Sequence, residues 1–179
     1  MDLVPKLVKS KDNKALMQRI ALEELKIVME DMEEDKALGS SDFNAKFIKV
    51  RWEIVHKDLL KMVLKYQQYE RIGGSTNSAF LVLIPKEKYV VTFDRYRPIS
   101  LCNIGYKIIT KIMENRLKTI MLRIIPENQG SFIKGRRIWD NIILVQEEIH
   151  SILKNHENGM VVKLDLANAF NRVCHPFLF

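Results

Sequence analysis

The chain has 179 residues, of which 47% are hydrophobic and 28% are charged. This composition suits one folded domain and excludes a disordered or collagen-like chain. The longest apolar run, residues 79–85, is far shorter than the ~20 residues of a membrane-spanning helix, and no secretory signal is recognisable. The chain contains two cysteines, which are too few for a disulfide framework. We therefore expect a soluble intracellular domain, in either the nucleus or the cytoplasm.

The net charge of +7 is concentrated in the middle of the chain. Residues 80–137 carry 12 Lys and Arg against 4 Asp and Glu, whereas the other residues carry 17 against 18. A basic field of this kind attracts nucleic acid, nucleotides or an acidic membrane surface. The charge alone leaves a solvated basic face without a partner equally open.

Hydrophobic periodicity predicts two long helices in the first half of the chain. The first spans residues 16–33, and the second spans about 43–69 after a loop at 35–42. The first apolar stripe comprises Leu22, Leu25, Val28, Met29 and Met32, and the second comprises Phe43, Phe47, Val50, Ile54, Val55, Leu59, Met62 and Tyr66. We expect both stripes to face the core, and we expect Gly73 and Gly74 to end the second helix.

The second half adds strands to helices. The apolar run at 80–84 is typical of a buried strand, and the polar stretch 86–97 is typical of an exposed turn. Helices are predicted at about 104–125, where Pro126 follows, and from Ile138 to near Gly159. Residues 160–166 alternate between apolar and polar side chains, as in a half-buried strand. The fold class is therefore mixed α/β and helix-rich, with a helical part at 1–79, a basic segment at 80–137, and a helix and strand at 138–179.

Asp165 lies near the C-terminal end of the last predicted strand, on the face opposite Leu164 and Leu166. A carboxylate held rigidly by a strand suits Mg²⁺, which takes oxygen ligands in octahedral geometry. An Asp at a strand end is also commonly a cap or a surface charge, so the residue alone leaves these roles open. The histidines lack zinc-ligand spacing, and no glycine-rich phosphate loop is present.

Several short motifs occur in order along the chain. They are Lys36-Ala37-Leu38-Gly39 with Phe43, Leu83-Ile84-Pro85-Lys86, Tyr96-Arg97-Pro98-Ile99-Ser100-Leu101-Cys102-Asn103, Tyr106-Lys107-Ile108-Ile109, Asn115-Arg116-Leu117, Asn128-Gln129-Gly130-Ser131-Phe132-Ile133-Lys134-Gly135-Arg136, Asp140-Asn141-Ile142, Lys163-Leu164-Asp165 and Ala169-Phe170. In this order and at this spacing, the sequence resembles the reverse transcriptases of LINE-type (non-LTR) retrotransposons, especially the plant members. Several motifs in sequence are far more specific than any one of them.

The resemblance implies a right-hand polymerase fold of fingers, palm and thumb. This chain would be a partial fold, comprising most of the fingers and the first palm strand, with the thumb and the catalytic hairpin absent. The implied activity is RNA-directed DNA polymerisation. Its partners would be an RNA or DNA template–primer and deoxynucleotides.

The resemblance also assigns roles to individual residues. Asp165 matches the first aspartate that binds Mg²⁺ in the palm, and Phe170 matches the aromatic gate that excludes a ribose 2′-OH. Lys86 and Arg97 match the fingers segment that reaches the triphosphate, which suits an ammonium and a guanidinium. Gln129, Arg136 and Arg137 match the segment that borders template and nucleotide. For Arg97 and Arg136, general affinity for backbone phosphates is an equally open reading.

Departures from the family pattern affect the expected activity. Asn171 replaces the usual Asp after the gate, and the loop at 36–43 has Leu38, Ser40 and Ser41 where the family prefers Pro, Pro and Asp. No Asp-Asp pair occurs within residues 1–179, although two-metal phosphoryl transfer needs carboxylates from both palm motifs. We therefore expect a reverse transcriptase fragment that is inactive alone. The alternatives are a catalytically dead remnant that binds nucleic acid non-specifically, and a decayed fragment without activity.

Overall fold

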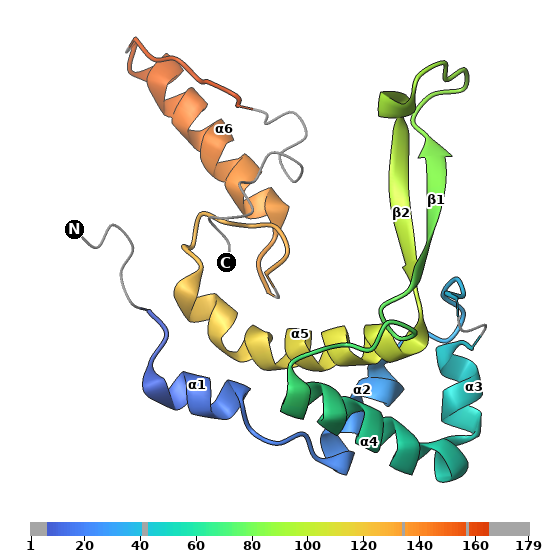
Figure 1. Ribbon diagram of the computed structural model, residues 1–179. Helices are drawn as coiled ribbons and strands as arrows, with labels where there is room; N and C mark the ends of the chain where they lie inside the picture. The colour runs from blue at the N-terminus through green and yellow to red at the C-terminus, as the bar shows by residue number, and fades with distance from the viewer. Residues whose placement is uncertain (1–6, 41–42, 134, 157, 165–179) are drawn as a thin grey trace. The chain divides into compact units, whose positions relative to one another are not determined.

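The structure is a computed structural model that describes residues 7–40, 43–133, 135–156 and 158–164. It divides into two compact units, Met1–Gln129 and Gly130–Phe179, and each is described by itself. Within the described residues the chain forms α-helices and one small antiparallel sheet (Figure 1). The mixed, helix-rich class predicted from the sequence is therefore confirmed.

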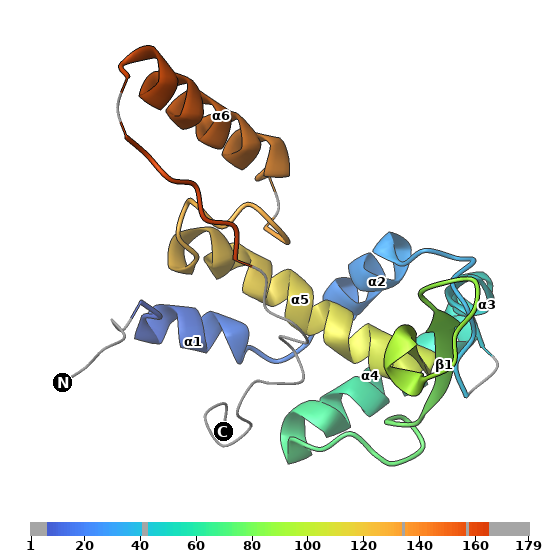
Figure 2. The ribbon, with the colours of Figure 1, turned by 90° about the horizontal axis from the view of Figure 1, so that it is seen from above.

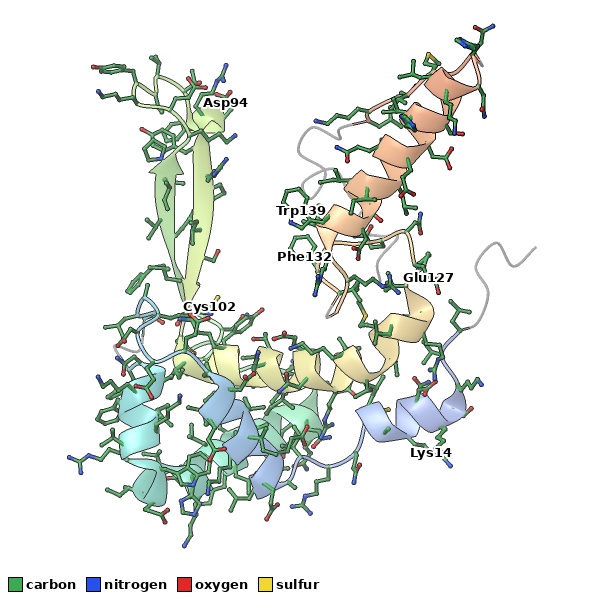
Figure 3. All side chains as sticks on the ribbon, turned by 180° about the vertical axis from the view of Figure 1, so that it is seen from behind. Lys14, Asp94, Cys102, Glu127, Phe132 and Trp139 are labelled. Carbon is green, nitrogen blue, oxygen red and sulfur yellow. The ribbon has the colours of Figure 1, made fainter. Side chains whose placement is uncertain are left out.

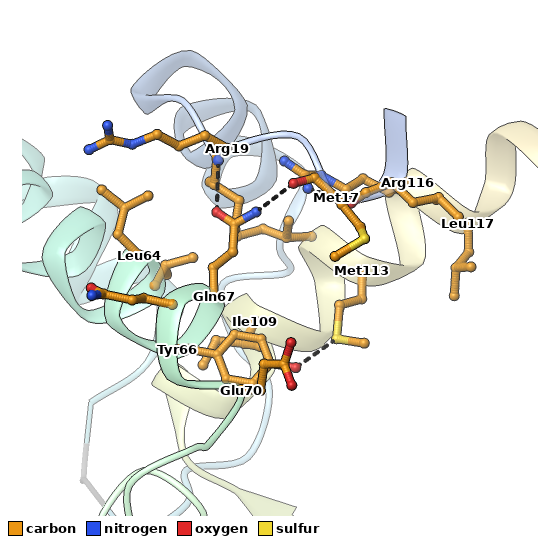
Figure 4. Close-up of a pocket in the computed structure, with 15 residues that line it drawn as sticks. Met17, Arg19, Leu64, Tyr66, Gln67, Glu70, Ile109, Met113, Arg116 and Leu117 are labelled. Carbon is orange, nitrogen blue, oxygen red and sulfur yellow. Dashed lines mark hydrogen bonds between the residues drawn. The ribbon is translucent and has the colours of Figure 1, made fainter. Parts of the chain in front are cut away.

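The first predicted helix corresponds to α2 (Leu22–Asp31), which lies within the predicted range of 16–33, and a further helix, α1 (Ser10–Leu16), precedes it. The predicted start at residue 16 was wrong, because a distant side chain, Gln67, supplies hydrogen-bond partners for the chain between α1 and α2. The Gln67 carboxamide accepts a hydrogen bond from the Ile20 amide at 3.1 Å and donates to the Met17 carbonyl at 3.2 Å (Figure 4). It also donates to the Gln18 carbonyl at 2.9 Å. These bonds satisfy backbone groups that a continuous helix would have paired internally.

The second predicted helix, at about 43–69, is divided into α3 (Ala45–Val50) and α4 (Trp52–Tyr69). Arg51 separates them with φ −102° and ψ 21°, which turns the axis of the chain. The predicted apolar stripe therefore does not stay on one face. Val55, Leu59, Met62 and Tyr66 pack against the core as expected, whereas Phe43, Phe47, Val50 and Ile54 are exposed. For these four residues the expectation of burial was wrong.

Helix α5 (Ile104–Ile124) is the central element of the first unit, and it confirms the prediction for 104–125. Figures 1 and 2 show α1 and α2 at successive positions along it. Its buried face packs against α2 and α4 in one core, whose fully buried members are Leu25, Val28, Met29, Val63, Ile108, Ile109 and Ile112. This 3.6-residue pattern of buried isoleucines explains why the helix could be predicted.

Polar links hold α5 to the N-terminal helices. The Arg116 guanidinium donates to both carboxylate oxygens of Glu24, each at 2.7 Å, and to the Leu16 carbonyl at 2.7 Å. Only 15% of the Arg116 side chain is exposed, so this forked ion pair is partly shielded from water. Arg123, near the end of α5, pairs with Asp12 in α1. A pocket of about 680 Å³ lies beside these links, between the α1–α2 connection, α4 and α5 (Figure 4).

The sheet consists of two strands, β1 (Ala79–Pro85) and β2 (Tyr96–Cys102). The strand expected at 80–84 is confirmed, but its expected burial was wrong because every residue of β1 is exposed. A run that is apolar at every position normally indicates cover on both faces. Here the rest of the described first unit leaves every residue of β1 exposed.

In the second unit, α6 (Ile138–Lys154) confirms the predicted fourth helix. Residues 160–164 form no strand, so the described part of the strand expected at 160–166 is absent. A strand requires a hydrogen-bonded neighbour, and no described segment pairs with these residues. None of the helices in the described ranges combines the length and apolar character needed to cross a membrane.

Candidate functional site

The candidate site is built on the hairpin of β1 and β2, whose base is fixed to the helical core. Asn103, only 4% exposed, caps α5 by accepting a hydrogen bond from the Tyr106 amide at 3.0 Å. Its side-chain amide donates to the Ser75 carbonyl at 2.7 Å, which ties down the segment leading into β1. One buried side chain therefore holds the start of α5 and both ends of the hairpin together.

The loop that resembles the family's motif at 36–43 also lies at this base. A β-carbon on Gly39 would collide with the Cys102 carbonyl, so only glycine allows this approach. The Lys107 amino group donates to the Ala37 carbonyl at 2.9 Å, and the hydroxyls of Ser40 and Ser78 lie 2.5 Å apart. Leu38 and Ser40, which depart from the family pattern, thus belong to a loop that supports the hairpin.

The strand register brings Lys86 and Arg97 together at the outer end of the hairpin. Arg97 lies opposite Ile84, and the Lys86 amide extends the ladder by donating to the Arg95 carbonyl at 2.9 Å. Since opposed residues share a face, Ile84 and Arg97 lie on one face, and Lys86 is the first residue after β1. Figure 3 shows Asp94 at the tip and Cys102 at the base, which marks the reach of the hairpin.

The cations at the tip differ in how they are used. The Lys86 amino group donates to the Asp94 carbonyl at 2.8 Å. Arg95 pairs with Glu87 at 2.9 Å and approaches Asp94 at 3.6 Å. The pKa of Asp94 is lowered, mainly by a hydrogen bond from the Thr92 side chain and further by Arg95 and Lys86, so this carboxylate stays ionised. The Arg97 side chain is exposed and forms no hydrogen bond or ion pair with any residue that the structure describes.

The same face of the hairpin carries an apolar strip that ends at Arg97. The strip comprises Phe80, Val82 and Ile84 on β1 with Ile99 and Leu101 on β2. Its four largest exposures are between 40 and 54%. An exposed apolar surface that leads to an unpaired guanidinium can contact a ligand that has both a flat apolar part and an anionic group.

The other predicted site residues belong to parts of the chain outside this hairpin. Gln129 ends the first unit in a turn in which its amide donates to the Pro126 carbonyl at 3.1 Å. Arg136 and Arg137 belong to the second unit, where Arg137 directly precedes α6. Asp165 and Phe170 lie outside the described residues. Their assigned roles therefore remain predictions.

The described residues offer no group of side chains that could complete the predicted metal site. Across the described ranges, no three His, Cys, Asp or Glu side chains are grouped so that they could hold a metal ion. The predicted ligand, Asp165, is not among those residues. A carboxylate there has the right donor chemistry for a hard cation, but a complete site would need further oxygen ligands.

Sequence reasoning missed β2 and the contacts it creates. Residues 96 and 97 were expected to belong to an irregular turn, yet both begin this strand. Pro98 lies within β2, where it is tolerated because in a two-stranded sheet either strand is an edge and accommodates the missing amide hydrogen. The available signal was the pairing of two short apolar stretches of equal length across a polar connection.

Comparisons with known proteins support the resemblance to reverse transcriptases. The family described as "Reverse transcriptase (RNA-dependent DNA polymerase)" matches residues 84–179, which is more than half of the chain. The "Transposon TX1 uncharacterized 149 kDa protein" of Xenopus laevis is 27% identical over 172 residues, covering 96% of this chain and 13% of that protein. The "RNA-directed DNA polymerase from mobile element jockey" of Drosophila funebris is 26% identical over 165 residues, covering 89% of this chain and 18% of its own length.

A third relative is shorter in its match. The "Probable RNA-directed DNA polymerase from transposon BS" of Drosophila melanogaster is 32% identical over 87 residues, which is 48% of this chain and 10% of that protein. The chain thus spans less than a fifth of the length of each of these three relatives. It belongs to the reverse transcriptase family and corresponds to a segment of the RNA-directed DNA polymerases of LINE-type mobile elements.

Proposed function

We propose that this chain forms the fingers and the beginning of the palm of a right-hand RNA-directed DNA polymerase. In this proposal, Lys86 and Arg97 contact the triphosphate of an incoming deoxynucleotide. The observation that carries it is the register of β1 and β2, which brings both cations to the outer end of the hairpin. The template–primer, RNA or DNA, is the second substrate of the proposed enzyme.

Arg97 is suited to this role because its guanidinium is exposed and unpaired among the described residues. A guanidinium can donate two parallel hydrogen bonds to phosphate oxygens, which gives direction as well as charge. Lys86 is already held by the Asp94 carbonyl, so its charge is fixed in place beside the site. The apolar strip that ends at Arg97 offers a surface for the rest of the nucleotide.

The proposal assigns the chemistry itself to the palm. Asp165 would contribute a ligand for Mg²⁺, the ion we propose for this divalent-metal family, and Phe170 would exclude the ribose 2′-OH. A bound ion of this kind neutralises charge on the transferring phosphate. Gln129, Arg136 and Arg137 would contact the template and the nucleotide from the segment before α6. Because one carboxylate cannot hold two ions, the remaining ligands would come from outside residues 1–179.

The test places residues 1–179 in an active relative, in exchange for the matching segment. In this chimera Arg97→Ala should raise the KM for deoxynucleotides roughly tenfold to hundredfold, since a charge-assisted hydrogen bond contributes about 1.5–3 kcal/mol. Lys88→Ala is the matched control, because Lys88 is exposed on the same tip and the substitution removes the same charge. An equal rise in KM for both variants would show that only general charge matters and would contradict the proposed role of Arg97.

The basic segment at 80–137 supports a second candidate function, non-specific nucleic-acid binding without catalysis. Its excess of 12 cations over 4 anions should give weak binding to RNA or DNA with a strong salt dependence, since counterion release dominates such binding. A gel shift titrated with salt tests this expectation. Base-selective binding, or no binding at low salt, would count against it.

A further inference from the structure

A second cluster of cations lies in the N-terminal helical part, before the residues that match the family. It surrounds a pocket of about 540 Å³ formed by the C-terminal half of α4, the segment after it and one residue of α5. Lys61, Lys65 and Arg71 line this pocket together with Tyr69, and Asp58 is the acidic residue among its lining groups. The segment after α4 leads to β1 (Figure 1), and Gly73, Ser75 and Thr76 of this segment line the pocket.

Two of the three cations that line the pocket, Lys65 and Arg71, have no anionic partner among the described residues. Lys61 and Lys65 are four residues apart on α4, so their like charges face each other on one side of the helix and repel. Asp58 pairs with Lys61 at 3.2 Å. Within the described part of the chain, the side chains of Lys65 and Arg71 have neither a hydrogen bond nor an ion pair. A phosphate group bound by Lys65 and Arg71 would accept hydrogen bonds from both side chains and would reduce the repulsion between Lys61 and Lys65.

The remaining lining is suited to a base and a sugar. Tyr69 follows Lys65 by four residues on the same side of α4, and 60% of it is exposed. The floor of the pocket is apolar, with half-buried Met62 and Ile72 and buried Ile109. Cations alternating with an exposed aromatic ring are characteristic of surfaces that bind single-stranded nucleic acid, where bases stack and phosphates are neutralised.

The far wall of the pocket is rigid rather than a loose loop. The Ser75 carbonyl accepts hydrogen bonds from the buried Asn103 side chain at 2.7 Å and from the Ser78 hydroxyl at 2.9 Å. The amides of Thr76 and Asn77 both donate to the Gly73 carbonyl at 2.9 Å. Because the wall is fixed, the pocket is present before a ligand binds.

From these observations we infer that the pocket bounded by Lys65, Tyr69 and Arg71 binds the sugar–phosphate backbone and one base of a single nucleic-acid strand. This inference rests on the proposed function and deepens it by giving the strand a contact separate from the nucleotide-binding hairpin. The ligand class is a phosphodiester strand, and RNA and DNA are its two sources.

The experiment measures binding of fluorescent 12-residue RNA and DNA strands to the full chain by anisotropy over a range of salt concentrations. Replacing both Lys65 and Arg71 by Gln should weaken binding at low salt about tenfold and reduce the slope of log Kd against log salt by about 1.4. The matched control is Lys26→Gln with Lys46→Gln, two exposed lysines on α2 and α3 that lose the same charge away from the pocket. Equal losses for the two double variants would overturn the inference.

Tyr69 separates a strand site from a merely basic surface. Tyr69→Ala should weaken binding about fivefold or more, whereas Tyr69→Phe should retain it because stacking requires only the ring. If poly-glutamate binds as tightly as RNA and its binding is unaffected by Tyr69→Ala, the site selects charge rather than a strand, and the inference is wrong. The relative affinities for RNA and DNA identify the source.

The two proposals fail separately. If the role proposed for Arg97 is wrong, Arg97→Ala should leave the KM for deoxynucleotides unchanged in the chimera. The Lys65 and Arg71 double variant should still weaken strand binding. Loss of the pocket's role would appear as unchanged strand binding in the Lys65 and Arg71 variant. Thermal unfolding followed by circular dichroism confirms that each variant is folded before its binding is compared.

Discussion

Arg116 shows how one side chain can join three parts of the helical unit. Its forked pair with Glu24 and its bond to the Leu16 carbonyl link α5 to α2 and to the end of α1. The Arg116 side chain is 15% exposed and the Glu24 side chain is 29% exposed. Loss of the arginine would therefore leave a partly desolvated carboxylate and a carbonyl without their partner.

We predict that Arg116→Met lowers the free energy of unfolding by roughly 1–3 kcal/mol, less than the cost of breaking a fully buried pair. Lys118→Met is the control, since the pair of Lys118 with Glu114 is 40% and 50% exposed and should contribute at most about 0.5 kcal/mol. Urea unfolding followed by circular dichroism measures both variants. Equal midpoints for the two would show that the Arg116 fork adds no stability.

Asn171 is the departure from the family pattern closest to the predicted catalytic residues. It lies outside the described residues, so its role is argued from the chemistry of its neighbours. Asp165 and Phe170 keep the residue types that their proposed roles require, whereas position 171 is not a proposed metal ligand.

The chimera with an active relative should therefore extend a primer with Asn171 in place, and Asn171→Asp should raise the rate only modestly. Primer extension by gel electrophoresis is the measurement. A folded chimera that stays inert until Asn171 is changed would show that this substitution, rather than the missing carboxylates, is the decisive defect.

Helix α5 depends on the residue that precedes it. Asn103 accepts from the Tyr106 amide and donates to the Ser75 carbonyl, so it performs two tasks with two different atoms. Substitutions that keep one atom and remove the other can separate them.

Asn103→Ala should lower the free energy of unfolding by about 1–3 kcal/mol, because it removes the cap of α5 and the hydrogen bond to the Ser75 carbonyl. Asn103→Asp keeps the accepting oxygen but replaces the donor to Ser75 with a second oxygen. It should retain α5 while loosening the base of the hairpin. Hydrogen exchange at the amides of Tyr106 and of β1 distinguishes the two outcomes, and equal exchange in both variants would contradict the division of tasks.

The α2–α5 contact also sets a dependence on pH. Lys118 and Lys111 hydrogen-bond Glu114 and lower the pKa of its carboxyl group below its ordinary value of 4.5. The pKa of Lys111 is raised above 10.5, chiefly by its hydrogen bond with Asp31 and further by Glu114. A lowered carboxyl pKa stabilises the folded state fully above pH 4.5, and a raised lysine pKa stabilises it fully below pH 10.5.

The free energy of unfolding should therefore fall as the pH drops through the lowered pKa of Glu114, and fall again as the pH rises above 10.5. Glu114→Gln should flatten the acid limb. Glu33→Gln should leave it unchanged, because the pair of Glu33 with Lys36 is 73% and 61% exposed. Urea midpoints measured from pH about 3 to 7 test the acid limb, and an unchanged limb in Glu114→Gln would contradict this assignment.

Sequence patterns predicted those elements whose partners lie within the element itself. The isoleucine periodicity of α5, with a capping Asn before it and a Pro after it, is complete without reference to the rest of the chain. The break between α1 and α2 was not predictable, because its cause is Gln67, a side chain from a helix far along the sequence. β1 was expected to be buried because a fully apolar run looks the same in a covered sheet and in an exposed two-stranded one.

The candidate site follows the same division. The residue types at Lys86 and Arg97 were recognised from motifs, but their approach at the outer end of the hairpin depends on β2, which the pattern did not reveal. The roles of Asp165, Phe170, Gln129, Arg136 and Arg137 stay predictions, because the described structure does not test them.

At the scale of the molecule, residues 1–179 contain one proposed catalytic carboxylate, Asp165. Two-metal phosphoryl transfer needs ions about 3.5–4 Å apart, and one carboxylate cannot hold both. A polypeptide of residues 1–179 should therefore show no primer extension above background with Mg²⁺ and deoxynucleotides. Template-dependent incorporation that Asp165→Ala abolishes would overturn this expectation.

The pairing of Arg116 with Glu24 joins residues 92 positions apart, and this has a consequence during synthesis. At about 5–20 residues per second, a ribosome adds Arg116 roughly 5–20 seconds after Glu24. The isoleucines of α5 that cover Leu25, Val28 and Met29 also arrive in that interval. Until then the apolar face of α2 lacks its native cover, so it stays exposed on the nascent chain while α5 is being made.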